Sequence, residues 1–317
     1  MRSLLNRIGV VVWSGTLALL IVAFTSVVWG ALTASNIKSS PAVPWAVPVM
    51  AVILWLLWQY LAGKWWPRRT SEARRRYLRA NHMSGELFVW SLLAGVLAIV
   101  ALAGYWIVFF HLVRMRANSL GDYSKYPLLT VVLMLVMSSL VSPVSEEAAF
   151  RGYCQVMLGG IFRAPTAVVL SSFFFMLAHL NHGLFWPKLL VYFLVGVVFG
   201  TIAHLANSIL ASIPVHVIGD LTFFFLIWPY DSARRLVWQG GLGMGWFWLH
   251  TAQAVLFTVL TILALRRLAG SPAEGVKCRG TMEEKPRPGE IASYRRLICP
   301  QAPRRPVHSP EAQRPKP

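Results

Sequence analysis

The sequence predicts an all-α, polytopic integral membrane protein with about eight transmembrane helices and a disordered C-terminal tail. Hydrophobic residues make up 56% of the chain, charged residues only 13%, and the mean hydropathy is +0.56. An ordinary globular domain has about a quarter charged residues. The apolar residues also gather into long stretches separated by short polar segments. This composition excludes a soluble enzyme.

Each predicted helix is a stretch that meets or approaches the roughly 20 apolar residues needed to cross a bilayer. The first stretch is longer than the apolar part of a signal peptide and has no clear cleavage pattern, so we expect it to be an anchor. The eight stretches cover about residues 8–32, 42–62, 87–112, 126–143, 165–181, 187–204, 209–228 and 245–265.

The basic residues predict how these helices are oriented. The formal net charge is +18, from 30 Lys and Arg against 12 Asp and Glu. With the N-terminus inside, 23 of the basic residues fall in inside segments and 7 in outside segments. Because cytoplasmic loops carry the excess of Lys and Arg, we expect both termini in the cytoplasm and a location in the plasma (inner) membrane. The basic runs flank membrane helices, so we expect the lipid bilayer as a partner and no nucleic acid.

The chain divides into four predicted regions. Residues 1–125 form N-terminal transmembrane helices and a basic cytoplasmic loop, and residues 126–228 form a core that holds most of the intramembrane polar residues. Residues 229–269 hold the last helix. Residues 270–317 are rich in Pro and Arg and poor in large apolar side chains, so we expect this tail to be disordered.

The first polar cluster surrounds two adjacent acids, Glu146 and Glu147. Glu147 and Arg151 are four residues apart with the acid first, which favours an ion pair on one helix face. Glu146 then remains without an obvious local partner, as a candidate general base. Pro143 either kinks the fourth helix or begins a new one that Ser142 caps. The alternative interpretation is that both acids only complement a helix N-terminus.

Two histidine clusters follow in the next helices. Phe175 and His179 are one turn apart, so an aromatic ring is expected beside the imidazole; His182 reads as a structural histidine. His216 and Asp220 also share one helix face. The alternative for this pair is a hydrogen bond that joins two helices. A further acid, Asp231, follows a Trp-Pro-Tyr sequence and is expected in a loop.

In this order, the three clusters resemble the three motifs of the CAAX prenyl protease and bacteriocin-processing family of intramembrane endopeptidases. The resemblance covers about residues 126–228. It implies that Glu146 is the general base and binds the attacking water together with His179. It also implies that Glu147 is structural and held by Arg151, and that His216 and the residue at position 220 stabilise the oxyanion.

One departure from the family pattern affects the chemistry. Members often carry Asn at the position of Asp220, and only a protonated Asp can donate a hydrogen bond as that amide does. Asp220 could instead orient His216, or complete a zinc site with Glu146, His179 and His216. We favour a mechanism that requires no cofactor, with zinc as the alternative.

The expected substrate is a membrane-associated protein or peptide: a prenylated C-terminus, a leader peptide or a C-terminal sorting tail. A second hypothesis is a protein without catalytic activity, either a scaffold or immunity-type partner or an ion carrier that uses the same buried acids and histidines. An internal repeat with broken helices would favour a carrier, and the sequence shows none.

Overall fold

The structure is a computed structural model, which describes residues 2–116, 125–239 and 242–270. Within these residues all regular secondary structure is helical, so the predicted all-α membrane fold is confirmed. The predicted tail lies outside the described residues except for Gly270. The α-helices are α1 (Arg2–Ser39), α2 (Ala46–Leu61), α3 (Ser71–Leu78), α4 (Gly85–Leu112), α5 (Leu128–Glu146), α6 (Gln155–Gly159), α7 (Ala164–Ala178), α8 (Trp186–Leu205), α9 (Ser212–Thr222) and α10 (Leu242–Gly270).

Eight apolar helical segments correspond one to one to the predicted stretches. Six are long and apolar enough to cross a membrane, and the shorter apolar helices α2 and α7 complete the set. The π-helices η2 and η4 extend α5 and α9, and short 3₁₀ helices occupy several connections. Their bounds are η1 (Arg68–Thr70), η2 (Glu147–Cys154), η3 (Leu180–His182), η4 (Phe223–Ile227), η5 (Trp228–Ala233) and η6 (Val237–Gln239).

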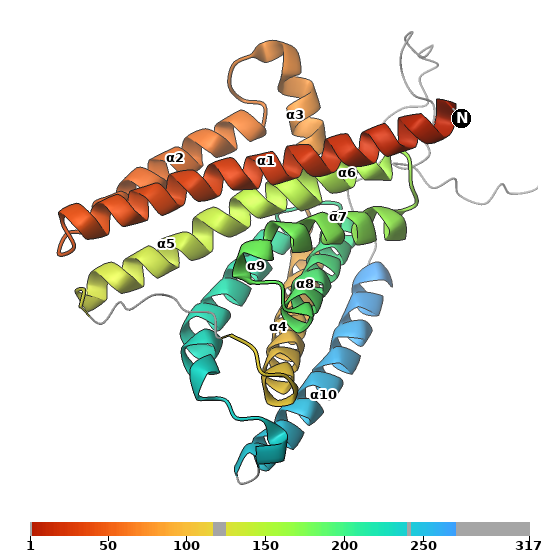
Figure 1. Cartoon of the computed structure of the whole chain (residues 1–317). Coiled ribbons are helices and arrows are strands. Elements are labelled where there is room, and N and C mark those ends of the chain that lie inside the picture. Colours follow the sequence, from red (N-terminus) through yellow and green to blue (C-terminus); the bar gives the residue numbers. More distant parts are fainter. Residues whose placement is uncertain (1, 117–124, 240–241, 271–317) are drawn as a thin grey trace, which may run out of the picture. The chain divides into compact units, whose positions relative to one another are not determined.

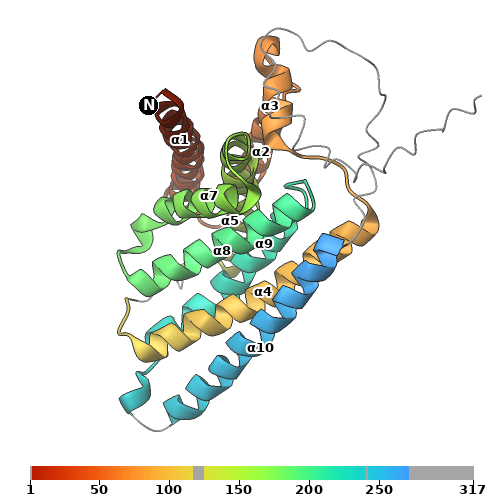
Figure 2. The ribbon, with the colours of Figure 1, turned by 90° about the vertical axis from the view of Figure 1, so that its right-hand side faces the viewer.

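The helices of residues 1–273, one compact unit, form two groups. In Figure 1, α1, α2 and α5 lie side by side, and Figure 2 views these three nearly along their axes. In the other group α10 packs along the length of α4, and α4 also contacts α8 and α9. The π-helix η2 contacts both groups, because it packs on α1 as well as on α7 and α8. The end of α5 therefore lies where the two groups meet.

Small residues allow α4 and α10 to approach closely. A Cβ atom on Gly104 would lie 3.0 Å from the backbone oxygen of His250 and 3.0 Å from the backbone nitrogen of Ala254. Lipid tails are as apolar as helix surfaces, so the hydrophobic effect does not drive helices together inside a bilayer. Close van der Waals packing stabilises such helix pairs instead. A larger side chain at position 104 would separate the two helices.

The fourth predicted stretch does not end at Pro143. The helix runs from Leu128 through this proline and continues to Gly159, with π-helical turns at Glu147–Cys154. Of the two alternatives for Pro143, a new helix capped by Ser142 is therefore wrong, because Ser142 lies within α5. Proline removes one helical hydrogen bond, and π-helical turns inside α-helices are frequent at functional sites. The two acids lie at the change from α-helix to π-helix.

The short helix α3 packs against η2. Arg79, which ends α3 in the left-handed conformation, donates a hydrogen bond of 3.1 Å to the backbone oxygen of Arg151. A Cβ atom on Gly152 would lie 3.1 Å from the backbone oxygen of Leu78. The segment that follows α2 therefore supports the turn of η2 that carries Arg151.

Candidate active site

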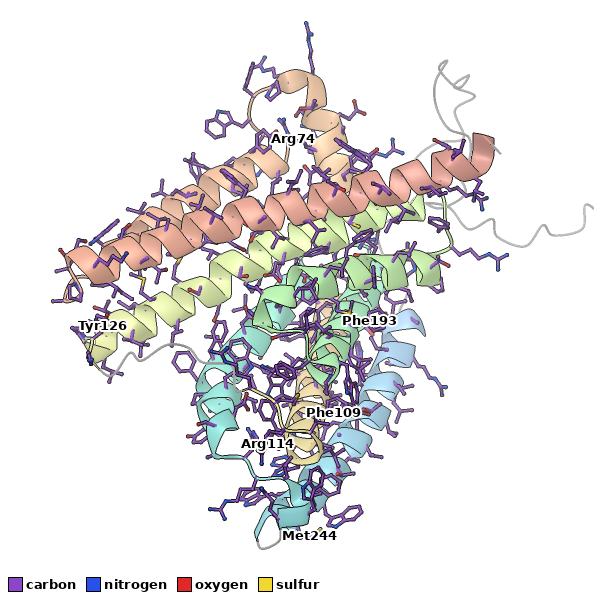
Figure 3. The ribbon with its side chains drawn as sticks, viewed as in Figure 1. Arg74, Phe109, Arg114, Tyr126, Phe193 and Met244 are labelled. Carbon is purple, nitrogen blue, oxygen red and sulfur yellow. The ribbon has the colours of Figure 1, made fainter. Side chains whose placement is uncertain are left out.

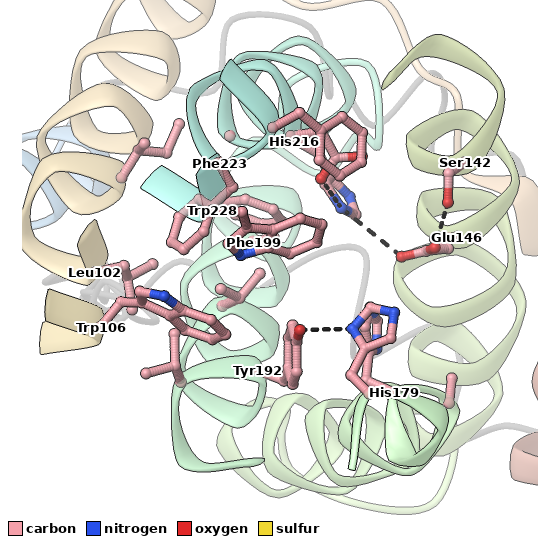
Figure 4. A pocket seen from close by; sticks show the side chains of 18 of the residues that line it. Leu102, Trp106, Ser142, Glu146, His179, Tyr192, Phe199, His216, Phe223 and Trp228 are labelled. Carbon is pink, nitrogen blue, oxygen red and sulfur yellow. Dashed lines mark hydrogen bonds and ion pairs between the residues drawn. The ribbon is translucent and has the colours of Figure 1, made fainter. Parts of the chain in front are cut away.

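A cavity of about 660 Å³ lies between the two helix groups. Its polar side is formed by the four residues that the sequence identified as catalytic candidates: Glu146, His179, His216 and Asp220. These side chains come from α5, the end of α7, and α9. Aromatic and aliphatic side chains of α4, α8 and the segment after α9 form the rest of the wall (Figure 4). The fold thus brings the three sequence clusters to one place.

Glu146 has one occupied and one available carboxylate oxygen. Its Oε1 atom accepts a hydrogen bond of 2.5 Å from the Ser142 hydroxyl, one helical turn earlier. Its Oε2 atom has no hydrogen-bond partner among the described residues and lies 3.7 Å from His216 Nε2. The side chain is 7% exposed and lines the cavity. Ser142 is a partner that the sequence analysis missed, although the spacing of four residues could have indicated it.

Glu147 is fully buried and does not line the cavity. Its Oε1 atom lies 2.9 Å from an Arg151 terminal nitrogen and 2.9 Å from His216 Nδ1. The sequence analysis gave Glu147 only the partner Arg151. The structure adds His216, which is 69 residues away in the chain. Glu147 Oε2 has no hydrogen-bond partner among the described residues either, but it does not face the cavity.

His216 is held in a defined orientation. Since a carboxylate can only accept, Nδ1 of the ring donates to Glu147. Nε2 then faces two other acids, at 3.7 Å from Glu146 Oε2 and 3.7 Å from Asp220 Oδ1. The Phe199 ring lies beside the imidazole, with its centroid at 4.9 Å. His216 therefore presents one nitrogen to the structural ion pair and the other to the cavity.

His179 presents its nitrogens in a similar way. Its Nδ1 atom donates a hydrogen bond of 2.8 Å to the backbone oxygen of Phe175, because a carbonyl can only accept. Nε2 remains for other interactions. The ring stacks on Tyr192 at 4.4 Å and packs against Phe175 at 4.5 Å. The Arg151 guanidinium also packs on Phe175, with its central carbon 4.2 Å from the ring centroid.

His182 also lines the cavity, and its Nδ1 atom lies 2.6 Å from the Tyr192 hydroxyl. The sequence analysis set this histidine aside as structural. Its hydrogen bond to Tyr192 fits that role, and Tyr192 in turn stacks on His179. His182 is therefore part of the wall that positions the His179 ring.

The aromatic end of the cavity depends on Asp231. The expectation of a loop residue is wrong: Asp231 lies in η5 and is 2% exposed. Both carboxylate oxygens accept from Trp106 Nε1, at 3.2 and 3.1 Å, and Arg234 Nε donates to Oδ1 at 3.0 Å. The Trp106 ring lines the cavity next to Phe223 and Trp228. Sequence spacing could not indicate this contact, since Trp106 and Asp231 are 125 residues apart.

The residues do not fit a metal ion as they are arranged. Among the described residues, no group of three His, Cys, Asp or Glu side chains has the arrangement of a metal site. Nε2 of His216 is 3.7 Å from both nearby carboxylates, Glu146 Oε2 and Asp220 Oδ1. The chemistry below is derived from the side chains alone.

One family model matches the part of the chain that holds these side chains. The family model of type II CAAX prenyl endopeptidases, Rce1-like, matches residues 128–222. No curated protein and no solved structure matches the chain. The matched segment contains both glutamates, Arg151, both cavity histidines and Asp220, whereas Trp106 and Asp231 lie outside it. The match supports a CAAX-type intramembrane protease. The chain is an integral membrane protein, and its segment 128–222 is similar to type II CAAX prenyl endopeptidases of the Rce1-like family.

Proposed function

We propose that this protein is an intramembrane endopeptidase that hydrolyses a peptide bond in a membrane-associated protein or peptide, with water activated by Glu146 and His179. One observation carries the proposal: Glu146 Oε2 has no hydrogen-bond partner among the described residues and lies in a cavity that His179 and His216 also line. A buried carboxylate oxygen without a partner is costly. A general base needs such an oxygen to receive a proton.

The proposed reaction uses one water and no cofactor. Glu146 Oε2 takes a proton from the water, while His179 Nε2 accepts a hydrogen bond that orients it. The water oxygen attacks the scissile carbonyl carbon, and the carbonyl oxygen becomes an oxyanion. Glu146 then gives the proton to the leaving nitrogen as the carbon–nitrogen bond breaks, which releases an amine and a carboxylic acid and leaves Glu146 ionised again.

His216 and Asp220 stabilise the oxyanion in this proposal. Because Nδ1 of His216 is bonded to Glu147, only Nε2 can donate to the oxyanion, and it must carry a proton to do so. Asp220 likewise donates only in its protonated form. Donors aimed at the developing charge are worth about 2.7–4 kcal/mol each in well-studied hydrolases. Glu147 and Arg151 act indirectly, as positioning residues for His216.

The substrate enters a cavity whose wall is mainly apolar, so the segment that is cut carries apolar groups. A prenylated C-terminus, a leader peptide or a C-terminal sorting tail meets this requirement. The test is cleavage of fluorogenic peptides of these three kinds by the full chain in proteoliposomes, with and without a chelator. Cleavage by the wild type in chelator, and none by Glu146→Gln, is expected. Cleavage by Glu146→Gln at the wild-type rate contradicts the mechanism, and loss of wild-type cleavage in chelator shows a metal requirement.

The proposed orientation places both termini in the cytoplasm of a cell with this protein in its plasma (inner) membrane. The excess of basic residues in the inside segments supports it. Single cysteines introduced at exposed positions 69 and 116 test it by labelling intact cells with an impermeable maleimide. Labelling is expected at position 116 and not at position 69, and the reverse result contradicts the orientation.

A further inference from the structure

A second concave site lies on the outer face of α1 and α2, away from the catalytic cavity. This groove has a volume of about 200 Å³ and is lined by residues of α1 between 24 and 29, residues of α2 between 53 and 60, and Trp65. Its wall is almost entirely aliphatic and aromatic. The hydroxyl of Thr25 is satisfied within α1, where it donates to the backbone oxygens of Ile21 and Val22. The groove therefore suits a hydrocarbon chain.

Arg74 fixes the segment that contributes Trp65 to the wall of this groove, here called the groove-end loop (residues 64–70). Arg74 is 5% exposed, and its guanidinium donates to the backbone oxygen of Trp65 at 2.5 Å and to the Thr70 hydroxyl at 2.7 Å. It also lies 4.4 Å from the centre of the Tyr60 ring, which lines the groove. Figure 3 shows Arg74 between α2 and α3. The groove-end loop is therefore held in a fixed position next to the groove by Arg74.

The groove-end loop carries three exposed cations, Lys64, Arg68 and Arg69. None of the three has an ion pair or a hydrogen bond from its side chain to any of the described residues. The groove-end loop contains no acid, and Glu72 is the nearest one along the chain. The groove is apolar, and the loop that contributes Trp65 to its wall carries these three cations. This combination is complementary to a molecule with an acyl chain and an anionic headgroup. Each such cation contributes about 1 kcal/mol of attraction at an anionic membrane surface.

We propose that this groove binds an anionic phospholipid, with one acyl chain between α1 and α2 and its phosphate on the cations of the groove-end loop. Trp65 joins the two parts, since it lines the groove and directly follows Lys64. The exposed ring of Trp66 next to it is suited to the headgroup region, where Trp is enriched. The site is independent of the proposed peptidase reaction, so binding is measured without any substrate.

The experiment is native mass spectrometry of the purified full chain with equal amounts of dioleoyl phosphatidylglycerol and dioleoyl phosphatidylcholine, which share their acyl chains. We expect the wild type to retain at least about fivefold more phosphatidylglycerol. The variant Lys64→Gln/Arg68→Gln/Arg69→Gln should lose this preference. The matched control removes three exposed cations elsewhere, Arg114→Gln/Arg116→Gln/Arg235→Gln, and should keep it. An equal loss of the phosphatidylglycerol preference in both variants would show that net charge alone causes it, and would overturn the proposal.

Two tryptophan variants test the groove separately from the charges. Leu56→Trp fills the groove, whereas Val52→Trp adds the same side chain at an exposed position on the same helix that does not line it. Only Leu56→Trp should reduce phosphatidylglycerol retention to the phosphatidylcholine level. Unchanged retention in a folded Leu56→Trp protein, judged by its melting temperature, overturns the proposal. Displacement of the lipid by glycerol phosphate alone would also overturn the proposal, because binding would then depend on the headgroup and not on an acyl chain in the groove.

Discussion

Two buried acid clusters lie behind different parts of the cavity wall, and they differ in whether a carboxylate oxygen faces the cavity. Asp231 and Glu147 are both almost completely buried, and each has an arginine partner, Arg234 and Arg151. Both oxygens of Asp231 are occupied by the indole of Trp106. The Glu147 cluster differs because the preceding residue, Glu146, lines the cavity and has one oxygen, Oε2, with no hydrogen-bond partner in the described part of the chain.

This comparison shows which features indicate a reactive site in a membrane protein. Burial and an arginine partner are common to both clusters, so they indicate only that a charge is compensated. The distinguishing feature is an available carboxylate oxygen that lies 3.7 Å from His216 Nε2, in a cavity that His179 also lines. An acid inside a membrane segment is expected by default to serve catalysis or transport. Asp231 shows that such an acid can instead hold an aromatic ring of a cavity wall, here Trp106.

The largest effect is expected where the clusters differ most. Glu146→Gln removes the proton acceptor but keeps the shape and the possible hydrogen bond to Ser142, so the cleavage rate should fall about 10³-fold, within the range typical of general base catalysis. The initial rate in proteoliposomes measures it. Asp231→Asn is the matched control, because it makes the same carboxylate-to-amide change at the other cluster and should retain a rate within about tenfold. Similar losses in both variants would remove the distinction between the clusters.

The next effect concerns stability. Glu147→Ala leaves the buried Arg151 without its partner and frees His216 Nδ1, so the free energy of unfolding should fall by about 3–5 kcal/mol. The rate should fall with it, because His216 loses its fixed orientation. Unfolding in a denaturing detergent, followed by circular dichroism, measures the first effect. Glu147→Ala/Arg151→Ala should be less destabilised than the sum of the single variants; additive losses would mean that the pair is not coupled.

Much of the site could be predicted from spacing within single helices. The pairs Glu147 with Arg151 and His216 with Asp220 are each four residues apart, and the helix period places such residues on one face. The apolar stretches likewise predicted all eight helical segments. These features depend on local periodicity, which a sequence displays directly.

Contacts between helices distant in sequence could not be predicted in this way. The bond from Glu147 to His216 spans 69 residues and that from Trp106 to Asp231 spans 125. The π-helical turns after Pro143 could not be predicted either, because the apolar stretch ends near Pro143 although the helix continues. In contrast, Ser142 and Glu146 are four residues apart, and the expected cap at Pro143 concealed a contact that the spacing allowed.

A smaller effect is expected at the aromatic end of the cavity. Trp106→Phe keeps an aromatic ring but leaves both Asp231 oxygens without the indole donor, which should cost about 1–3 kcal/mol of unfolding free energy. Because the ring also lines the cavity, the variant should change the relative rates for peptides with apolar groups of different size. Rates for a short and a long acyl or prenyl group, compared with wild type, measure this change. An unchanged ratio would mean that Trp106 does not limit the space available to the substrate.

The smallest effect tests how far Glu146 depends on its hydrogen bond from Ser142. Ser142→Ala removes a donor to Oε1 and leaves Oε2 in place, so the carboxylate loses a net stabilisation of about 0.5–1.5 kcal/mol. The rate should fall about threefold to tenfold, because the rotamer of the base is then less fixed. Ser142→Thr retains a hydroxyl and should restore most of the rate. Restoration separates a positioning role of the hydroxyl from a simple loss of packing, since Thr and Ala both change the shape of this position while only Thr can donate to Glu146.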